Sequence, residues 1–137
     1  MGLYLCIFDA DEDAEGVDIG AYSDFDFFRS IITEELEAGQ PGAKFPTLIL
    51  HSDCDGEWSV GGCAALEKEL KEIATSLKKL PPRPFNAVWQ RAVGKSQGLK
   101  PENLLECFID VDGEPLVSRL ILLCRMAQER NMPISFQ

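Results

Sequence analysis

The residue types that most often carry chemistry are concentrated in one short segment, residues 51–58, here named the acidic turn. It contains the only histidine of the chain, three carboxylates, a thiol and a tryptophan: His51, Asp53, Asp55, Glu57, Cys54 and Trp58. The preceding residues are β-branched and apolar, which predicts a strand, and α/β proteins commonly place binding loops at the ends of strands. Metal binding, catalysis and partner recognition are therefore the three hypotheses for this segment.

The spacing in the acidic turn excludes an EF-hand calcium site. If Asp53 is the first ligand, the sixth and twelfth residues are Trp58 and Ala64, whereas the calcium loop requires glycine and glutamate there. A zinc site built on His51 and Cys54 would need distant ligands, and the sequence has no second Cys/His pair to supply them. We therefore expect no metal and no cofactor, and keep a metal site as a minority alternative.

Catalysis by Cys54 and His51 is also disfavoured. A catalytic base normally approaches its nucleophile from elsewhere in the fold, and no Gly-x-Ser-x-Gly elbow is present. A single histidine removes most schemes of general acid–base catalysis at neutral pH. Convergence of acidic side chains for hydrolysis stays open, but solvated acidic turns are far more common. No catalytic residue is assigned.

Partner recognition is the third hypothesis for the acidic turn. Trp58 offers aromatic contact area, and the flanking carboxylates could bind Arg or Lys of a partner. The alternative is that Trp58 only packs at the start of the following helix, which Ser59 would cap.

A second acidic segment, from Asp110 to Glu114, precedes a predicted helix that Pro115 opens. It would form a second arm of one acidic face, or it would only stabilise the helix N-terminus, by a few tenths to about 1 kcal/mol. The charged residues between positions 9 and 18 are interpreted as a solvent-exposed run of charges and not as a site. The candidate partner-binding residues are Asp53, Asp55, Glu57, Trp58, Asp110 and Asp112.

The charge balance indicates the kind of partner. Thirteen Lys and Arg residues against twenty-three Asp and Glu residues give a formal net charge of −10, which repels nucleic acid and anionic membranes. A basic protein would be attracted instead. The alternative is that the acidity serves only solubility.

Cysteine usage and hydropathy predict a cytoplasmic protein. The five cysteines lack CxxC spacing and most lie in apolar stretches, so we expect reduced core thiols and no disulfide framework. The longest apolar run, Leu120–Cys124, is too short to cross a bilayer, and no charged-then-apolar leader opens the chain.

Four segments have the pattern of strands. Residues 3–8 form a continuous apolar run, typical of a central strand buried on both faces. Residues 47–51 are a second strand, residues 108–112 alternate like a half-buried strand, and residues 133–136 form a last one. The acidic stretch 11–20 is expected to be a loop.

Three main helices are predicted. Ser23 caps the first, which ends near Gly39; the second ends before Pro81; the third begins at Pro115 and ends at Asn131. Their buried faces are marked by apolar residues at helical spacing, which are Phe25, Phe28, Ile32 and Leu36, then Leu66, Leu70, Ile73, Ala74 and Leu77, then Leu116, Leu120, Leu123, Cys124 and Ala127.

The pattern is weakest between Phe85 and Cys107. Trp89 and Val93 indicate one short helix there, and Pro101 would open another. The order of elements predicts a single domain over residues 1–137, of α+β (mixed α/β) class. It would have a small sheet of three to four strands packed with about three main helices.

Two blocks of the sequence resemble the immunity protein 70 family. The first runs from Lys44 to Trp58, KFPTLILHSDCDGEW, and the second from Cys107 to Leu116, CFIDVDGEPL. The resemblance covers most of the chain and is least specific between Phe85 and Gly98.

This resemblance implies a cytoplasmic, non-enzymatic protein that accompanies a bacterial polymorphic toxin and neutralises the cognate toxin domain by binding it. An acidic inhibitor suits a basic nuclease, whose substrate groove it could block, although charge alone motivates the nuclease. The alternative function is a small metal-dependent hydrolase, or another enzyme, that uses the acidic turn.

Overall fold

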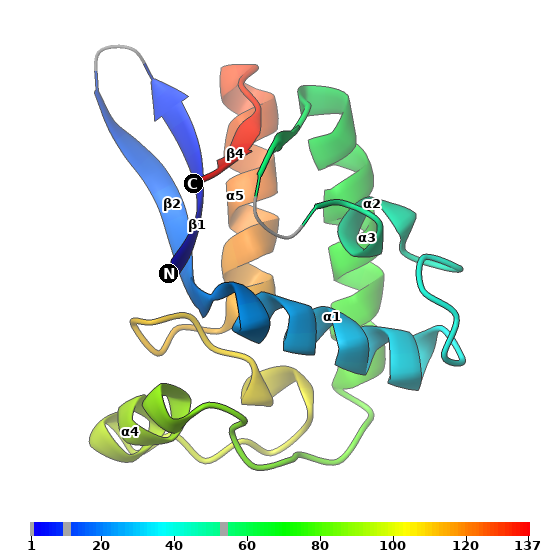
Figure 1. Ribbon diagram of the computed structural model, residues 1–137, viewed down its shortest axis with the longest axis vertical. Helices are drawn as coiled ribbons and strands as arrows, with labels where there is room; N and C mark the ends of the chain where they lie inside the picture. The colour runs from blue at the N-terminus through cyan, green and yellow to red at the C-terminus, as the bar shows by residue number, and fades with distance from the viewer. Residues whose placement is uncertain (1, 10–11, 53–54) are drawn as a thin grey trace.

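A computed structural model describes residues 2–9, 12–52 and 55–137, and its strands form one antiparallel sheet (Figure 1). The spatial order of the strands is β2-β1-β4-β3. Their bounds are β1 Gly2–Asp9, β2 Glu12–Ala21, β3 Glu57–Trp58 and β4 Ile134–Phe136. The last strand in the sequence, β4, therefore lies between β1 and β3. It pairs with β1, so the first and last strands of the chain are neighbours in the sheet.

The helices lie behind and below the sheet in the view of Figure 1. Helices α3 and α5 pack side by side, and α1 crosses beneath the sheet. The bounds are α1 Tyr22–Leu36, α2 Pro46–Ile49, α3 Val60–Leu77, α4 Val88–Gln97, the 3₁₀ helix η1 Leu105–Cys107 and α5 Leu116–Arg130. The expected α+β fold is confirmed.

The elements with the clearest patterns of apolar residues lie where the sequence predicts them. Strand β1 lies inside the sheet, and its residues Leu3, Leu5 and Ile7 are fully buried. The three main helices correspond to α1, α3 and α5, and their predicted apolar faces lie in one hydrophobic core cluster. Asn131 ends α5 in the left-handed conformation, with φ of 54°. The short helix around Trp89 is also confirmed, as α4.

The prediction of a loop over residues 11–20 is wrong, because residues 12–21 form β2, which pairs with β1 as a hairpin. Val17 and Ile19 are buried while Asp18 between them is exposed, which is the alternation of a half-buried strand. The acidic residues of this segment conceal that alternation in the sequence.

The strand predicted over residues 47–51 is also wrong, because residues 46–49 form the short helix α2. Pro46 occupies its first turn, where a missing N–H does no harm. The carboxylate of Glu69, on α3, accepts hydrogen bonds from the backbone N–H groups of Thr47 and Leu48, at 3.2 and 3.1 Å. A tertiary contact therefore satisfies the helix N-terminus and overrides the β propensity of the segment.

Three smaller expectations are corrected. Helix α1 begins one residue before Ser23, with Ala21 as its N-cap, and the Asp24 carboxylate accepts the Ala21 N–H at 2.8 Å. Residues 108–112 contribute only an isolated bridge between Ile109 and Pro115. The helix expected from Pro101 is reduced to the 3₁₀ turn η1. Among the described residues, no helix is long and apolar enough to cross a membrane.

Candidate partner-binding site

The acidic turn follows α2 and ends with β3. Its first residue, His51, is anchored by contacts with the rest of the fold. The imidazole ring stacks on Phe136 of β4, with ring centroids 4.3 Å apart and planes at 19°. Its Nδ1 lies 2.9 Å from the carbonyl oxygen of Ser52, and its Nε2 lies 2.9 Å from that of Glu57. Each ring nitrogen thus faces a backbone carbonyl of the turn, and the nitrogen that carries the proton donates to its carbonyl, so the imidazole braces the turn.

Arg29 of α1 holds the start of the acidic turn from the other side. Its Nη1 donates to the carbonyl oxygen of His51 at 2.7 Å and contacts those of Leu48 and Ile49 at 3.3 and 3.4 Å. The carbonyls of Leu48 and Ile49 are at the C-terminus of α2, where carbonyl groups lack a partner within the helix. The guanidinium supplies the missing donor. Asp26 pairs with the other end of the same guanidinium at 2.9 Å. Nothing in the local sequence marks Arg29 as part of this site, because its partners lie about twenty residues away in the chain.

Trp58 supports the turn from within the core. Its side chain is only 3% exposed, and its Nε1–H donates to the carbonyl oxygen of Thr47 at 3.0 Å. Ser59 caps α3, because its hydroxyl accepts the N–H of Gly62 at 3.0 Å. The aromatic surface expected from Trp58 is therefore absent, and the alternative in which Trp58 packs at the start of the helix is confirmed.

The exposed carboxylates of the acidic turn are Asp55 and Glu57. Glu57 begins β3, where it pairs with Ser135 of β4, so its backbone is fixed by the sheet. Gly56 between them has φ of +85°, the left-handed conformation that glycine adopts without strain. Asp53 and Cys54, the other two residues of the acidic turn considered for chemistry, lie outside the described residues.

The second acidic segment is organised around a buried carboxylate. Asp110 is 1% exposed, and its Oδ1 accepts the backbone N–H groups of Asp112 and Glu114 at 2.9 and 3.0 Å. Its Oδ2 has no hydrogen bond, although the Arg119 guanidinium lies 3.5 Å away. Burial raises the pKa of Asp110, while the two N–H donors and Arg119 act against that shift. Asp110 therefore closes the turn and offers no surface to a partner.

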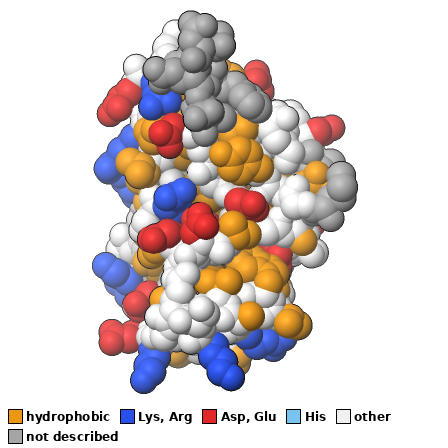
Figure 2. Space-filling model, turned by 90° about the vertical axis from the view of Figure 1, so that its left-hand side faces the viewer, with side chains coloured by type: hydrophobic (Ala, Val, Ile, Leu, Met, Phe, Trp, Pro, Cys, Tyr) orange, Lys and Arg blue, Asp and Glu red, His pale blue; other side chains and the backbone are white. Residues whose placement is uncertain are grey.

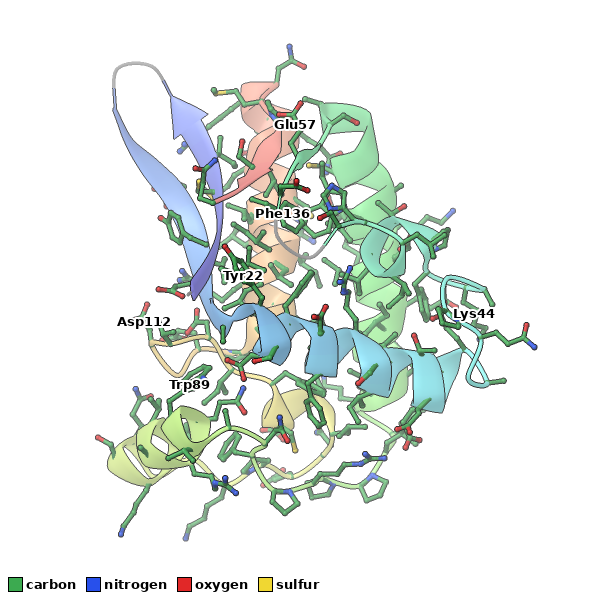
Figure 3. The ribbon with its side chains drawn as sticks, in the orientation of Figure 1. Tyr22, Lys44, Glu57, Trp89, Asp112 and Phe136 are labelled. Atoms are coloured by element: carbon green, nitrogen blue, oxygen red, sulfur yellow. The ribbon has the colours of Figure 1, made fainter. Side chains whose placement is uncertain are left out.

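Asp112 is exposed, but it does not lie on the same face as the acidic turn. Figure 3 shows Glu57 in the upper part of the molecule and Asp112 at its left side, near mid-height and above Trp89 of α4. The N–H of the neighbouring Val111 donates to the carbonyl oxygen of Asp18 at 3.1 Å, which fixes this turn beside β2. The structure thus keeps Asp55 and Glu57 together in the acidic turn and places Asp112 away from them, so the described candidates do not form one acidic face.

A mainly apolar cavity of about 170 Å³ lies between α1 and the chain that follows α3. Helix α1 contributes Phe27, Phe28 and Ile31 to its lining, and the later segment contributes Pro84 and Gln90. None of the described residues of the acidic turn, 51–52 and 55–58, lines it. Among the described residues, no group of three or more His, Cys, Asp or Glu side chains could hold a metal ion.

Comparison with protein families agrees with the resemblance found in the sequence. The model of the family described as Immunity protein 70 matches residues 3–136. The chain therefore belongs to the immunity protein 70 family, and this membership supports a role as an immunity protein. No curated protein and no solved structure matches the chain.

Proposed function

We propose that the protein neutralises a cognate bacterial toxin by binding it through the exposed carboxylates of the acidic turn. The observation that carries this proposal is a braced turn: Asp55 and Glu57 are exposed on a backbone held by His51 and Arg29. Carboxylates on a rigid backbone bind basic partners without losing much conformational freedom, which favours affinity. Asp53 belongs to the same segment of sequence and is included in the proposal.

The roles of the other candidates follow from their positions. Trp58 and Asp110 act from inside the fold, by shaping the two turns, and do not touch the toxin. Asp112 is exposed at the left side of the molecule in Figure 3, away from Glu57, so we assign it to the toxin interface only for a toxin that spans both turns.

We further propose that the cognate toxin is basic, as a nuclease would be, and that binding takes place in the cytoplasm. The support is the net charge of −10, which steers a basic partner toward the protein and accelerates association. Binding without catalysis is sufficient for this role. A cognate toxin that acts on peptides or sugars would contradict the nuclease.

The experiment has two stages. First, the tagged protein captures its toxin from the bacterium that produces both, and mass spectrometry identifies what elutes as salt is raised. Second, association and dissociation rates of that toxin are measured for wild type, for D55K/E57K, and for a matched control, E34K/E129K, which reverses two exposed glutamates on α1 and α5.

We expect D55K/E57K to slow association at low salt by about tenfold or more and to flatten its salt dependence, whereas the control changes it much less. Equal slowing by both pairs would mean that only net charge matters, and the acidic turn would then not be the binding face. Unchanged kinetics for D55K/E57K would reject it as well.

A further inference from the structure

The basic residues of this acidic protein are gathered in one part of the chain. Residues 78–100, here named the basic end, contain six of the thirteen Lys and Arg residues and none of the twenty-three Asp and Glu residues. The six are Lys78, Lys79, Arg83, Arg91, Lys95 and Lys100. The remaining seven cations share the rest of the chain with every acidic residue, so positive charge is concentrated in this one segment of the sequence.

All six cations of the basic end are exposed. Among the described residues only Arg83 has an ion-pair partner, Glu35 of α1, and the other five carry uncompensated charge. Figure 2 shows Lys and Arg side chains at the lower end of the molecule, which is where Figure 1 places α4. An exposed patch of uncompensated positive charge attracts an anionic partner.

The aromatic residues of the basic end are turned inward. Trp89 donates its Nε1–H to the Asp24 carboxylate at 2.9 Å, and its ring lies against Gly20, where a Cβ would come within 2.7 Å. Phe85 packs against Gly94 of α4, where a Cβ would approach its ring to 2.6 Å. Both rings are therefore partly covered by the protein, which leaves little aromatic surface for stacking on bases, the usual way in which proteins hold single-stranded nucleic acid.

The surrounding charge disfavours a long polyanion. A nucleic-acid duplex or an anionic bilayer extends well beyond a patch of this size, and it would meet the acidic remainder of the protein within about one Debye length, roughly 8–10 Å. A short acidic segment of a protein can cover the basic end alone. The distribution of charge therefore selects an acidic protein segment over the other anions.

The cavity beside the basic end adds an apolar contact. Arg83, Pro84, Asn86 and Gln90 of the basic end line it, opposite the phenylalanines of α1. Its volume of about 170 Å³ is close to that of cavities of about 150 Å³ that hold a benzene ring. It has room for one aromatic or branched aliphatic side chain, a common form of anchor in protein interfaces.

We propose that the basic end is a second interaction surface, which binds an acidic segment of a protein partner with one apolar side chain seated in the cavity. This surface is distinct from the acidic turn in position and opposite to it in charge. It goes beyond the proposed neutralisation of a toxin, since it gives the protein a second partner, or a second contact, of different chemistry.

The test uses a short fluorescent peptide in which Glu and Asp residues flank one Phe, with binding followed by anisotropy at low salt. A second peptide has Ser in place of Phe, and a DNA duplex with the same label is the competing anion. The variants are R91E/K95E on α4 and the matched control K44E/K68E, which reverses two exposed lysines outside the basic end. Figure 3 shows Lys44 on the side of the molecule away from Trp89 and α4. Circular dichroism verifies that each variant is folded.

We expect the Phe peptide to bind wild type, to bind R91E/K95E at least about tenfold more weakly, and to bind K44E/K68E within about twofold of wild type. The Ser peptide should bind wild type more weakly than the Phe peptide, because it lacks the anchor. Absence of peptide binding, equal losses in both variants, or tighter binding of the DNA duplex would each overturn the proposal. Equal affinity of the two peptides would overturn the part assigned to the cavity.

Discussion

The imidazole of His51 stacks on the phenyl ring of Phe136, so the first residue of the acidic turn rests on the last strand of the sheet. Phe136 also meets Trp58 edge-on at 4.7 Å, and its backbone N–H donates to the carbonyl oxygen of Gly56 at 3.0 Å. One residue of β4 thus supports both sides of the turn. The shape of the proposed toxin-binding surface depends on this contact.

Truncation of Phe136 should therefore damage stability and the turn together. F136A is expected to lower the free energy of unfolding by about 3–5 kcal/mol, the usual loss for a buried phenylalanine. H51A should lower it by only about 1 kcal/mol, because the ring is half-buried and in its neutral form donates one hydrogen bond. Urea denaturation measures both, and H51F, which keeps a stacking ring, is the control. A larger loss for H51A than for F136A would contradict this account.

Glu37 is a buried carboxylate that organises the loop between α1 and α2. Its oxygens accept the backbone N–H groups of Gly42, Lys44 and Phe45, and the hydroxyl of Thr33, at 2.9 to 3.2 Å. Burial raises the pKa of Glu37, but these donors outweigh it, and the pKa lies below its ordinary value. E37Q should lower the free energy of unfolding by about 2–3 kcal/mol at pH 7, because one amide cannot accept all four bonds.

The lowered pKa of Glu37 also predicts how the stability difference between wild type and E37Q depends on pH. A carboxylate with a lowered folded pKa stabilises the protein above its unfolded pKa, and this stabilisation is lost as pH falls through the folded pKa. The difference in unfolding free energy between wild type and E37Q should therefore shrink below about pH 4 to 5. T33V, which removes one of the four donors, is the milder control. A difference that is independent of pH would show that the carboxylate is not charged in the folded protein.

Asp110 should respond to pH in the opposite direction. Burial raises the pKa of Asp110 in the folded protein above its value in the unfolded chain. The stability that protonation of Asp110 contributes is therefore present below the unfolded pKa and is lost as pH rises through the folded pKa. D110N keeps an oxygen for the N–H groups of Asp112 and Glu114 and should remove this pH dependence. D110A leaves both N–H groups without an acceptor and should lower the free energy of unfolding by about 2 kcal/mol. Equal stability of the two variants at neutral pH would refute the role given to Oδ1.

Asp24 links the start of α1 to α4. Its Oδ2 accepts the N–H of Ala21 at 2.8 Å and the Nε1–H of Trp89 at 2.9 Å. W89F keeps most of the ring packing and should lower stability by about 1 kcal/mol, whereas D24A loses the helix cap as well and should lower it by about 2 kcal/mol. Hydrogen exchange should show faster amide exchange in α4 for both variants. Unchanged exchange there would mean that other contacts hold α4.

Much of the fold is predictable from local pattern, and the strand wrongly predicted over residues 47–51 has a clear physical cause. Helices α1, α3 and α5 carry apolar residues at helical spacing, and β1 and β4 are short apolar segments, so the local sequence predicts their type although the two strands pair with each other across the chain. Helix α2 is different, because the Glu69 carboxylate and the Arg29 guanidinium satisfy its two ends from elsewhere in the fold. Such tertiary partners leave no signal in the local sequence, so β propensity alone predicts the wrong element.

The residue types of the candidate site could be predicted from the sequence, but the burial of each side chain could not. Asp110 and Asp112 are the same residue type two positions apart, yet one is buried and the other exposed, because only Asp110 is enclosed by the turn that it closes. Trp58 and Glu57 differ in the same way across a two-residue strand. Turn composition indicates where a chain reverses, but the neighbours that cover a side chain come from distant segments.

The position of β4 in the sheet also concerns protein synthesis. Residues 134–136 pair with β1 on one side and with β3 on the other, so the sheet is discontinuous until they are available. In a nascent chain that still lacks them, His51 has no Phe136 ring to stack on, and the acidic turn keeps only the contacts from Arg29 and Trp58. The turn should therefore gain its final shape only after β4 has left the ribosome.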